Sequence, residues 1–317
     1  MLWDQHTCAE LVETADLTDL LRYRAAGGGL VSLNAGYAPH GPEVTGSLLR
    51  AYRAQVESIG GLALAASVDD VDRIAAAGDT AVVFDLEDCA PLGGDLDAVG
   101  PLVSLGVRTL APTYNYANLA GSGCLDADDT GLTPWGRDLV AEMNARGMVP
   151  DGSHVSARTS FDMCAVSSLP VVFSHSCMRA VWDHPRNITD DQARASADTG
   201  GVVGITGVGI FLGPNTPTLA AMVRHLEYAV DLVGIEHVGV STDFSFDWQT
   251  FRETLASSPE LYDASYTAWG PVEWMPPETF VALGDELDGR GWSAADITAV
   301  LGGNFRRVAL QSWKGTT

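Results

Sequence analysis

Eight short apolar segments recur along the chain and alternate with amphipathic segments of helical character, which limits the folds open to it. Several of these segments are near-continuous runs of valine, isoleucine, leucine and phenylalanine, typical of parallel strands covered on both faces. The segments are residues 2–6, 29–35, 81–87, 107–115, 148–154, 170–176, 201–207 and 237–243. Eight strands that alternate with helices predict a (β/α)8 barrel, the TIM barrel of the α/β class.

The segments between these runs carry the signals of helices. Thr189 is followed three residues later by Gln192, a capping-box pattern at a helix start. The competing architecture, an open doubly wound sheet, is disfavoured because no GxGxxG or P-loop motif follows the first strand. The amphipathic stretches are residues 17–27, 45–60, 136–147 and 219–234, and glycines stand where helices should stop, at Gly27, Gly60, Gly78, Gly147, Gly200 and Gly234.

Length and composition predict one domain rather than two. The chain has 317 residues, of which 46% are hydrophobic and 19% charged, enough for a large buried core. No internal repeat or shift in composition marks a linker, so we predict a single barrel over residues 1–317. The tail from about 245 to 317 is expected to pack on the barrel as helices, and the glycine- and aspartate-rich segment 118–131 to form a loop over its mouth.

The charge of the chain argues against two classes of partner. Its formal net charge is −23, from 41 acidic and 18 basic side chains, and Lys314 is the single lysine. Such a surface repels nucleic-acid phosphates and anionic membranes, so neither is expected as a partner. No apolar run approaches the roughly 18–20 residues of a membrane helix, and the first residues, MLWDQHTCAEL, lack a signal-peptide pattern. The expected location is the cytoplasm, where the cysteines at positions 8, 89, 124, 164 and 177 would be reduced thiols.

Polar side chains gather where the predicted strands finish. In a barrel all such carboxyl ends open on one face, where active sites form. A single strand-end histidine has a simpler explanation as a hydrogen-bonded structural residue, but three histidines and a glutamate on one rim indicate a zinc site. A carboxylate can bridge two metals roughly 3.5–4 Å apart, and Glu87 is the candidate for that role. The strand-end residues are His6, Glu87, Tyr114, Asn115, His154, His175 and Asp243, whereas histidines 40, 184, 225 and 237 are read as surface or structural.

Four segments of the chain resemble the membrane (renal-type) dipeptidase family of zinc metallopeptidases, peptidase family M19. They are residues 131–156, 170–192, 199–213 and 301–308, and the SHS and HPRNITD sequences in the second are the most distinctive. The similarity runs in order from about Asp4 to Val308. It implies a barrel of the metallo-dependent hydrolase type with two zinc ions, a soluble bacterial-type member of the family, and a small peptide as substrate. A homodimer is compatible with the resemblance, which leaves the oligomeric state open.

The resemblance also implies roles for individual residues. The metal ligands would be His6, Cys8, Glu87, His154 and His175, with Glu87 as the bridge. Arg186, in the HPRN sequence, would bind the terminal carboxylate of the substrate, with Tyr114 and Asn115 beside it. Asp243 would handle protons for the attacking water and the leaving amine. The implied reaction is hydrolysis of a dipeptide by a metal-bound hydroxide.

The chain departs from the family pattern at three places, after the first, third and fourth predicted strands. Cys8 stands where the family has an aspartate: its thiolate either binds zinc at about 2.3 Å, or it stays protonated and leaves the first site weak or empty. Tyr114 replaces a histidine, so it either donates a hydrogen bond to the developing oxyanion or packs as an aromatic in the barrel mouth. Glu87 is followed by Asp88 and Cys89 instead of small glycines, which alters the wall beside the metals.

Three charged residues keep alternative interpretations. Asp88 either supports the site from behind or is a loop carboxylate. Arg186 either binds the substrate carboxylate or anchors a helix start by pairing with an acid such as Asp183. Asp151 is expected to orient His154 or its strand neighbours, because metal-bound imidazoles usually donate their second N–H to such a group.

The leading hypothesis is a zinc-dependent dipeptidase. A second hypothesis keeps the metals but changes the substrate to an amide, lactam or conjugate of a specialised pathway, as the unusual Cys8, Tyr114 and Cys89 suggest. A third is a family member that has lost turnover and acts as a binding protein. Retention of Asp243 and Arg186 beside all three histidines speaks against the third, since a binding protein needs no residue for proton transfer.

Overall fold

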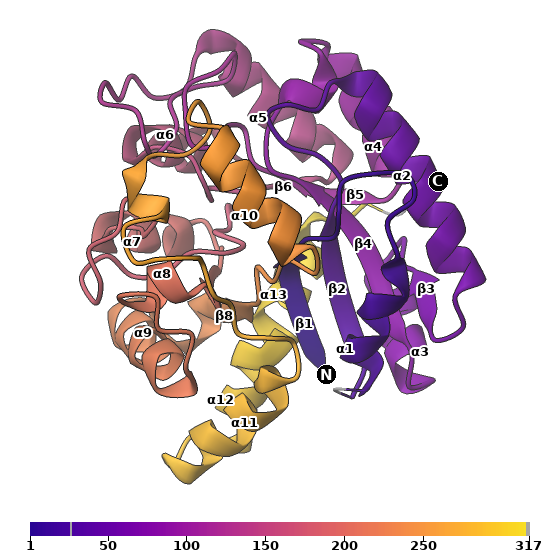
Figure 1. Ribbon diagram of the computed structural model, residues 1–317, viewed down its shortest axis with the longest axis vertical. Helices are drawn as coiled ribbons and strands as arrows, with labels where there is room; N and C mark the ends of the chain where they lie inside the picture. The colour runs from indigo at the N-terminus through magenta and orange to yellow at the C-terminus, as the bar shows by residue number, and fades with distance from the viewer. Residues whose placement is uncertain (26, 315–317) are drawn as a thin grey trace.

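The computed structural model describes residues 1–25 and 27–314 and confirms the (β/α)8 barrel (Figure 1). Five parallel strands follow one another in the order β1, β2, β4, β5, β6, and β7 pairs with β8. A further short strand, β3, pairs with the first half of β4. The strands are β1 (Leu2–Thr7), β2 (Gly29–Asn34), β3 (Leu62–Leu64), β4 (Thr80–Leu86), β5 (Val107–Leu110), β6 (Val149–Pro150), β7 (Val203–Thr206) and β8 (Val238–Ser241).

The predicted strand at 170–176 closes the gap between β6 and β7, but it pairs at only two residues. Val172 pairs with Asp151 on one side and Phe173 with Val203 on the other, both in parallel. The ladder stops there because the next backbone N–H groups donate to side chains: Ser174 N–H donates to Asp151 Oδ1 at 3.0 Å. The ring closes where the N–H of Asp243, after β8, donates to the carbonyl of His6 in β1 at 3.0 Å.

Several strands end earlier than the sequence predicted, because their last residues leave the ladder to face the barrel mouth. The segment predicted as a strand at 107–115 pairs only to Leu110, and the one at 148–154 only to Asp151, through its single bridge to Val172. Asn115, His154 and Asp243 all have positive φ, of 61°, 67° and 48°. Left-handed backbone is uncommon outside glycine and collects at functional sites.

Helices surround the strands (Figure 1). The predicted capping box is present, since the Thr189 side chain accepts from Gln192 N at the start of α7. Among the described residues, none of the helices combines the length and apolar character needed to cross a bilayer. The helices are α1 (Leu21–Ala25), α2 (Pro42–Ser58), α3 (Val68–Ala76), α4 (Val99–Ser104), α5 (Pro134–Arg146), α6 (Ala157–Val166), α7 (Asp190–Asp198), α8 (Gly209–Leu212), α9 (Leu219–Val233), α10 (Trp248–Ser257), α11 (Thr279–Gly289), α12 (Ala294–Thr298) and α13 (Asn304–Ser312).

The residues after β8 serve both ends of the barrel. Phe305 of α13 is 2% exposed and packs against strands β7 and β8. A Cβ added to Gly239 would lie 2.6 Å from the Phe305 ring, so this glycine makes room for the ring. Phe251 of α10, together with Val272 and Trp274, instead lines the cavity at the barrel mouth. The tail therefore both supports the barrel and covers its mouth.

Candidate metal centre and substrate cavity

The five residues predicted as metal ligands come together at the barrel mouth. Their donor atoms form two overlapping sets, and within each set the atoms lie within 4.8 Å of one another. One set is His6, Cys8 and Glu87; the other is Glu87, His154 and His175. Glu87 belongs to both.

The two carboxylate oxygens of Glu87 face different imidazoles. Its Oε1 lies 3.5 Å from Nε2 of His6, while its Oε2 lies 2.9 Å from Nε2 of His154 and 3.8 Å from Nε2 of His175. The amide of Asn34 donates to Oε1 from the neighbouring strand β2. This is the geometry that a bridging carboxylate requires.

An irregularity in β1 brings His6 into the cluster. Between Asp4 and Thr7, β1 has one residue more than the part of β2 that it pairs with, so the alternation of its side chains is broken. Such bulges are common beside active sites. His6 Nδ1 then donates to Asp85 Oδ1 at 2.9 Å. Because Nδ1 donates to Asp85, Nε2 is the nitrogen turned toward Glu87 and is the atom that can bind a metal once it is deprotonated.

The ring of His154 is oriented by an amide and not by Asp151. His154 Nδ1 lies 2.8 Å from Asn115 Oδ1, and Asn115 Nδ2 donates to the carbonyl of Leu261, which fixes the orientation of the amide. Nδ1 therefore carries the hydrogen and Nε2 is free to bind a metal. Asn115 is fully buried behind His154, which differs from the substrate contact that the sequence suggested for it.

Asp151 instead supports His175, across the gap between two strands. The Ser174 hydroxyl donates to Asp151, so it must accept from His175 Nδ1, 2.7 Å away. Asp151 Oδ1 also accepts from the N–H of Ser153, next to His154 in the chain. His175, like His154, thus presents a bare Nε2 to the cluster.

Cys8 points its sulfur at the first set of ligands. Its Sγ lies 3.5 Å from His6 Nε2 and 4.0 Å from Glu87 Oε1. Burial raises the pKa of the Cys8 thiol to about 12, so the thiol is protonated unless a cation is present to bind the thiolate. The geometry therefore fits a thiolate ligand.

The charges of the cluster favour a cation. Burial lowers the pKa of His6, but the carboxylates of Asp85 and Glu87 outweigh burial and raise it well above its usual value. Burial lowers the pKa of His154 to about 3, with Arg186 acting in the same direction, so this imidazole is neutral. Zinc binds neutral imidazoles, carboxylates and thiolates, so an ion bound here would displace the protons of His6 and Cys8.

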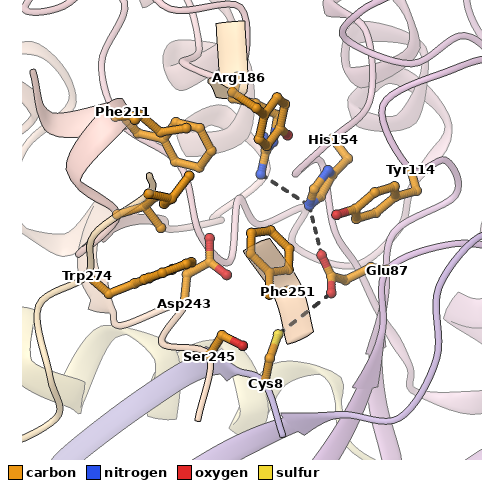
Figure 2. Close-up of a pocket in the computed structure, with 14 residues that line it drawn as sticks. Cys8, Glu87, Tyr114, His154, Arg186, Phe211, Asp243, Ser245, Phe251 and Trp274 are labelled. Carbon is orange, nitrogen blue, oxygen red and sulfur yellow. Dashed lines mark hydrogen bonds and ion pairs between the residues drawn. The ribbon is translucent and has the colours of Figure 1, made fainter. Parts of the chain in front are cut away.

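Asp243 lies against the same cluster on the far side from Glu87 (Figure 2). Its Oδ1 is 3.6 Å from His6 Nε2, and its side chain is 18% exposed to the cavity. Burial, reinforced by the charge of Glu87, raises the pKa of Asp243 to about 7. The adjacent Thr242 is held by Asp4, which accepts from its backbone N–H at 2.8 Å and from its hydroxyl at 2.5 Å.

Arg186 and Cys8 lie at opposite ends of the cavity over the cluster, as Figure 2 shows. Arg186 is 3% exposed, and its Nη2 lies 3.2 Å from His154 Nε2. Its Nε has no partner, and within the described residues its guanidinium forms no ion pair, with Asp183 or any other acid. A buried, unpaired guanidinium that lines a cavity is suited to an anionic ligand group.

Tyr114 contacts the cluster through its ring. The ring stacks on His154 with centroids 4.2 Å apart, and the hydroxyl lies 3.0 Å from that of Tyr262. The backbone N–H of Tyr114 donates to Asp88 Oδ2 at 2.8 Å. Asp88 also accepts from Asn118, so it ties together the loops behind the site.

Four residues that support the cluster were not among those predicted from the sequence. Asp85, Asn34 and Ser174 make the contacts described above, and Asp4 holds the turn before Asp243. For Asp85 a signal existed: it is a carboxylate inside an apolar strand, two positions before Glu87 and so on the same face.

Comparison with known proteins shows the family to which the chain belongs. Residues 43–256, more than half of the chain, match the model of the membrane dipeptidase family, peptidase family M19. An uncharacterised protein in the pqqA 5′ region of Klebsiella pneumoniae is 35% identical over 269 residues, which cover 81% of this chain and 91% of that protein.

Solved structures share the fold over nearly the whole chain. An amidohydrolase from Pseudomonas aeruginosa is 27% identical, with a TM-score of 0.87 over 99% of this chain and 96% of that one. A metallo-peptidase from Rhodobacter sphaeroides, solved with a phosphinate mimic of the dipeptide L-Ala-D-Ala, is 21% identical, with a TM-score of 0.80 over 98% of this chain and 99% of that one. The chain therefore belongs to the membrane dipeptidase family, peptidase family M19, and is a metal-dependent hydrolase.

Proposed function

We propose that the protein is a zinc-dependent dipeptidase that cleaves dipeptides with a free C-terminal carboxylate. The observation that carries this proposal is Glu87, whose two oxygens face His6 on one side and His154 and His175 on the other. The solved relative with a phosphinate mimic of a dipeptide supports the same class of substrate.

The donor atoms fit two zinc ions. His6, Cys8 and Glu87 would hold the first, and Glu87, His154 and His175 the second. When bound, such a pair lowers the pKa of a water toward about 7 and polarises the scissile carbonyl. A thiolate in place of the more usual oxygen ligand would make the first site softer.

Arg186 would fix the position of the substrate. Its unpaired, buried guanidinium lies at one end of the cavity, with Glu87 and Asp243 between it and Cys8 (Figure 2). A carboxylate bound there places the peptide bond, which lies next to the C-terminal residue, over the cluster. Because the guanidinium is buried, an uncharged C-terminal group would leave its charge unpaired and would satisfy fewer of its donors than a carboxylate does.

Asp243 would carry the proton from the attacking water to the leaving amine. Its carboxylate faces the cavity and the His6 end of the cluster, which puts it within reach of both groups. For Tyr114 we propose a positioning role in place of the oxyanion contact, because its ring covers His154 and its hydroxyl meets Tyr262.

The test combines zinc analysis with two matched substrate series. We expect about two zinc ions per chain in the wild type and about one in Cys8→Ala. The control is Cys164→Ala, which removes a partly buried thiol elsewhere and should keep both zinc ions. Dipeptides should be cleaved at least about 100-fold faster than the same dipeptides amidated at the C-terminus, because only the acid satisfies the buried guanidinium. Arg186→Met should abolish that preference.

Two results would contradict the proposal. Full zinc content without cleavage of any dipeptide in a broad panel would point to a different amide substrate or to a binding protein. Equal rates for the free acid and the amide would show that Arg186 does not bind the substrate carboxylate, whatever the zinc content.

A further inference from the structure

We propose that a second cavity beside the candidate metal centre receives the N-terminal residue of the dipeptide and selects a cationic side chain, that of lysine or arginine. This inference rests on the proposed dipeptidase function and names its substrate class. It comes from three features of the cavity: where it opens, which rings form its walls, and which charges stand at its rim.

The second cavity opens at the end of the first that is farther from Arg186. Both cavities are lined by Cys8, Glu87 and Phe251, whereas Arg186 lines only the first of the two. Figure 2 shows Arg186 and Cys8 at opposite ends, with Glu87 and Asp243 between them. A dipeptide whose carboxylate meets Arg186 and whose peptide bond lies over the cluster must direct its N-terminal residue toward Cys8.

The second cavity has room for a long side chain. Its volume, with the space at its mouth, is about 710 Å³, against about 460 Å³ for the first cavity. Its outer part is formed by residues 9–12 after β1 and by Thr250 and Thr254 of α10. The N-terminal side chain can therefore extend away from the metal cluster toward solvent.

Four aromatic rings form the walls next to the cluster. The ring centroids are 4.9 Å apart for Tyr37 and Tyr114, 5.9 Å for Tyr114 and Tyr262, and 5.9 Å for Phe251 and Tyr262. The faces of such rings attract ammonium and guanidinium groups, and the long methylene stems of lysine and arginine pack well on them.

The charges of the lining are all negative. Outside the metal ligands, the charged lining residues are Glu10 and Asp247 at the rim, and neither lysine nor arginine is among them. Burial lowers the pKa of His40, the remaining titratable base of the lining, so its imidazole is neutral at pH 7. The first cavity, by contrast, carries Arg186. The two ends of the site thus carry side chains of opposite charge. An acidic N-terminal side chain would be repelled where a basic one is attracted.

The experiment compares three dipeptides that differ only at the N-terminal side chain. Lysyl-alanine, norleucyl-alanine and glutamyl-alanine have side chains of similar length that are cationic, neutral and anionic. With the zinc-loaded full-length protein, we expect kcat/KM for lysyl-alanine to exceed that for norleucyl-alanine about tenfold and that for glutamyl-alanine about 100-fold. In Asp247→Asn and Glu10→Gln, the ratio of the lysyl to the norleucyl substrate should fall several-fold.

Asp288→Asn is the matched control, because it removes the same charge from an exposed position on α11 and should leave the ratio unchanged. If norleucyl-alanine is cleaved as well as lysyl-alanine or better, the inference is wrong while the dipeptidase function stands. If the variants shift the ratio no more than Asp288→Asn does, the rim acids do not select the substrate. If none of the three is cleaved but other dipeptides are, the inference is wrong, whereas the dipeptidase function fails only if no dipeptide of a broad panel is cleaved.

Discussion

The Nε2 atoms of His154 and His175 lie 2.9 Å apart, although 21 residues separate the two histidines in the chain. Each ring is held at its other nitrogen, by Asn115 and by Ser174, so both Nε2 atoms carry lone pairs. Two lone pairs at that separation repel each other unless a cation lies against both. The pair is arranged for a metal, and its geometry depends on the residues behind it.

Removing those supporting contacts should weaken the two metal sites separately. Asp85→Asn withdraws the charge behind His6, and Asn115→Ala removes the acceptor behind His154. Each change is expected to weaken one zinc site about 10–100-fold, as is typical for partners of metal-bound histidines. Titration with a competing chelator should show one weakened site in each variant and no change in Asp97→Asn, an exposed control. Two unaltered sites in both variants would contradict this assignment.

Asp4 should act on catalysis through Asp243. Asp4 is fully buried and holds Thr242, next to the left-handed Asp243. Asp4→Asn is expected to lower kcat on the order of 100-fold with KM and zinc content kept, because small displacements of a reacting group are costly.

A double-mutant cycle provides the check on that coupling. In an Asp243→Asn background, the Asp4→Asn change should lower kcat little further, since the effects of residues that act as a unit are not additive. Tyr23→Phe, which removes only one donor to Asp4, should have a smaller effect than Asp4→Asn. Fully additive losses from Asp4→Asn and Asp243→Asn would mean that Asp4 supports the fold and not Asp243.

His225 should make the protein acid-sensitive. Its Nδ1 accepts from the N–H of Met178, its Nε2–H donates to the carbonyl of Leu212, and burial lowers the pKa of His225 to about 4. The unfolded chain, with a histidine pKa of about 6.5, binds a proton more readily, so stability is present above about pH 6.5 and is lost as the pH falls toward 4. At pH 5 this residue should account for a loss of about 2 kcal/mol in the free energy of unfolding, relative to neutral pH.

Urea unfolding at pH 7 and pH 5 measures that contribution. In His225→Asn, whose amide oxygen can replace the Nδ1 acceptor, the loss of stability between the two pH values should be smaller by about that amount. Part of the loss should remain, since burial also lowers the pKa of His184 to about 4. An unchanged loss in the variant would show that His225 is not responsible.

Phe305→Ala should be among the costly substitutions in the barrel. The side chain is 2% exposed and packs against Gly204 and Gly239, so its removal leaves a cavity. We expect a loss of about 3–5 kcal/mol in the free energy of unfolding. Phe161→Ala makes the same chemical change at a side chain that is 39% exposed and should cost far less. Comparable losses in thermal unfolding would contradict the supporting role of α13.

The sequence by itself determined the barrel and the location of the site. Near-continuous apolar runs identify buried parallel strands from local composition alone, and eight of them close a ring. Because the carboxyl ends of parallel strands meet on one face, residues as distant as His6, Glu87 and His175 could be placed together without a structure. The family resemblance then connected those residues with zinc and dipeptides.

Only the tertiary structure decided which residue supports which ring. Asn115 and not Asp151 holds His154, Asp151 reaches His175 through Ser174, and Asp85 holds His6. These contacts join different strands, so they depend on register, on the extra residue in β1 and on left-handed backbone at the strand ends. The periodicity of a sequence shows which face a side chain occupies, but the partner it meets depends on how neighbouring strands are aligned.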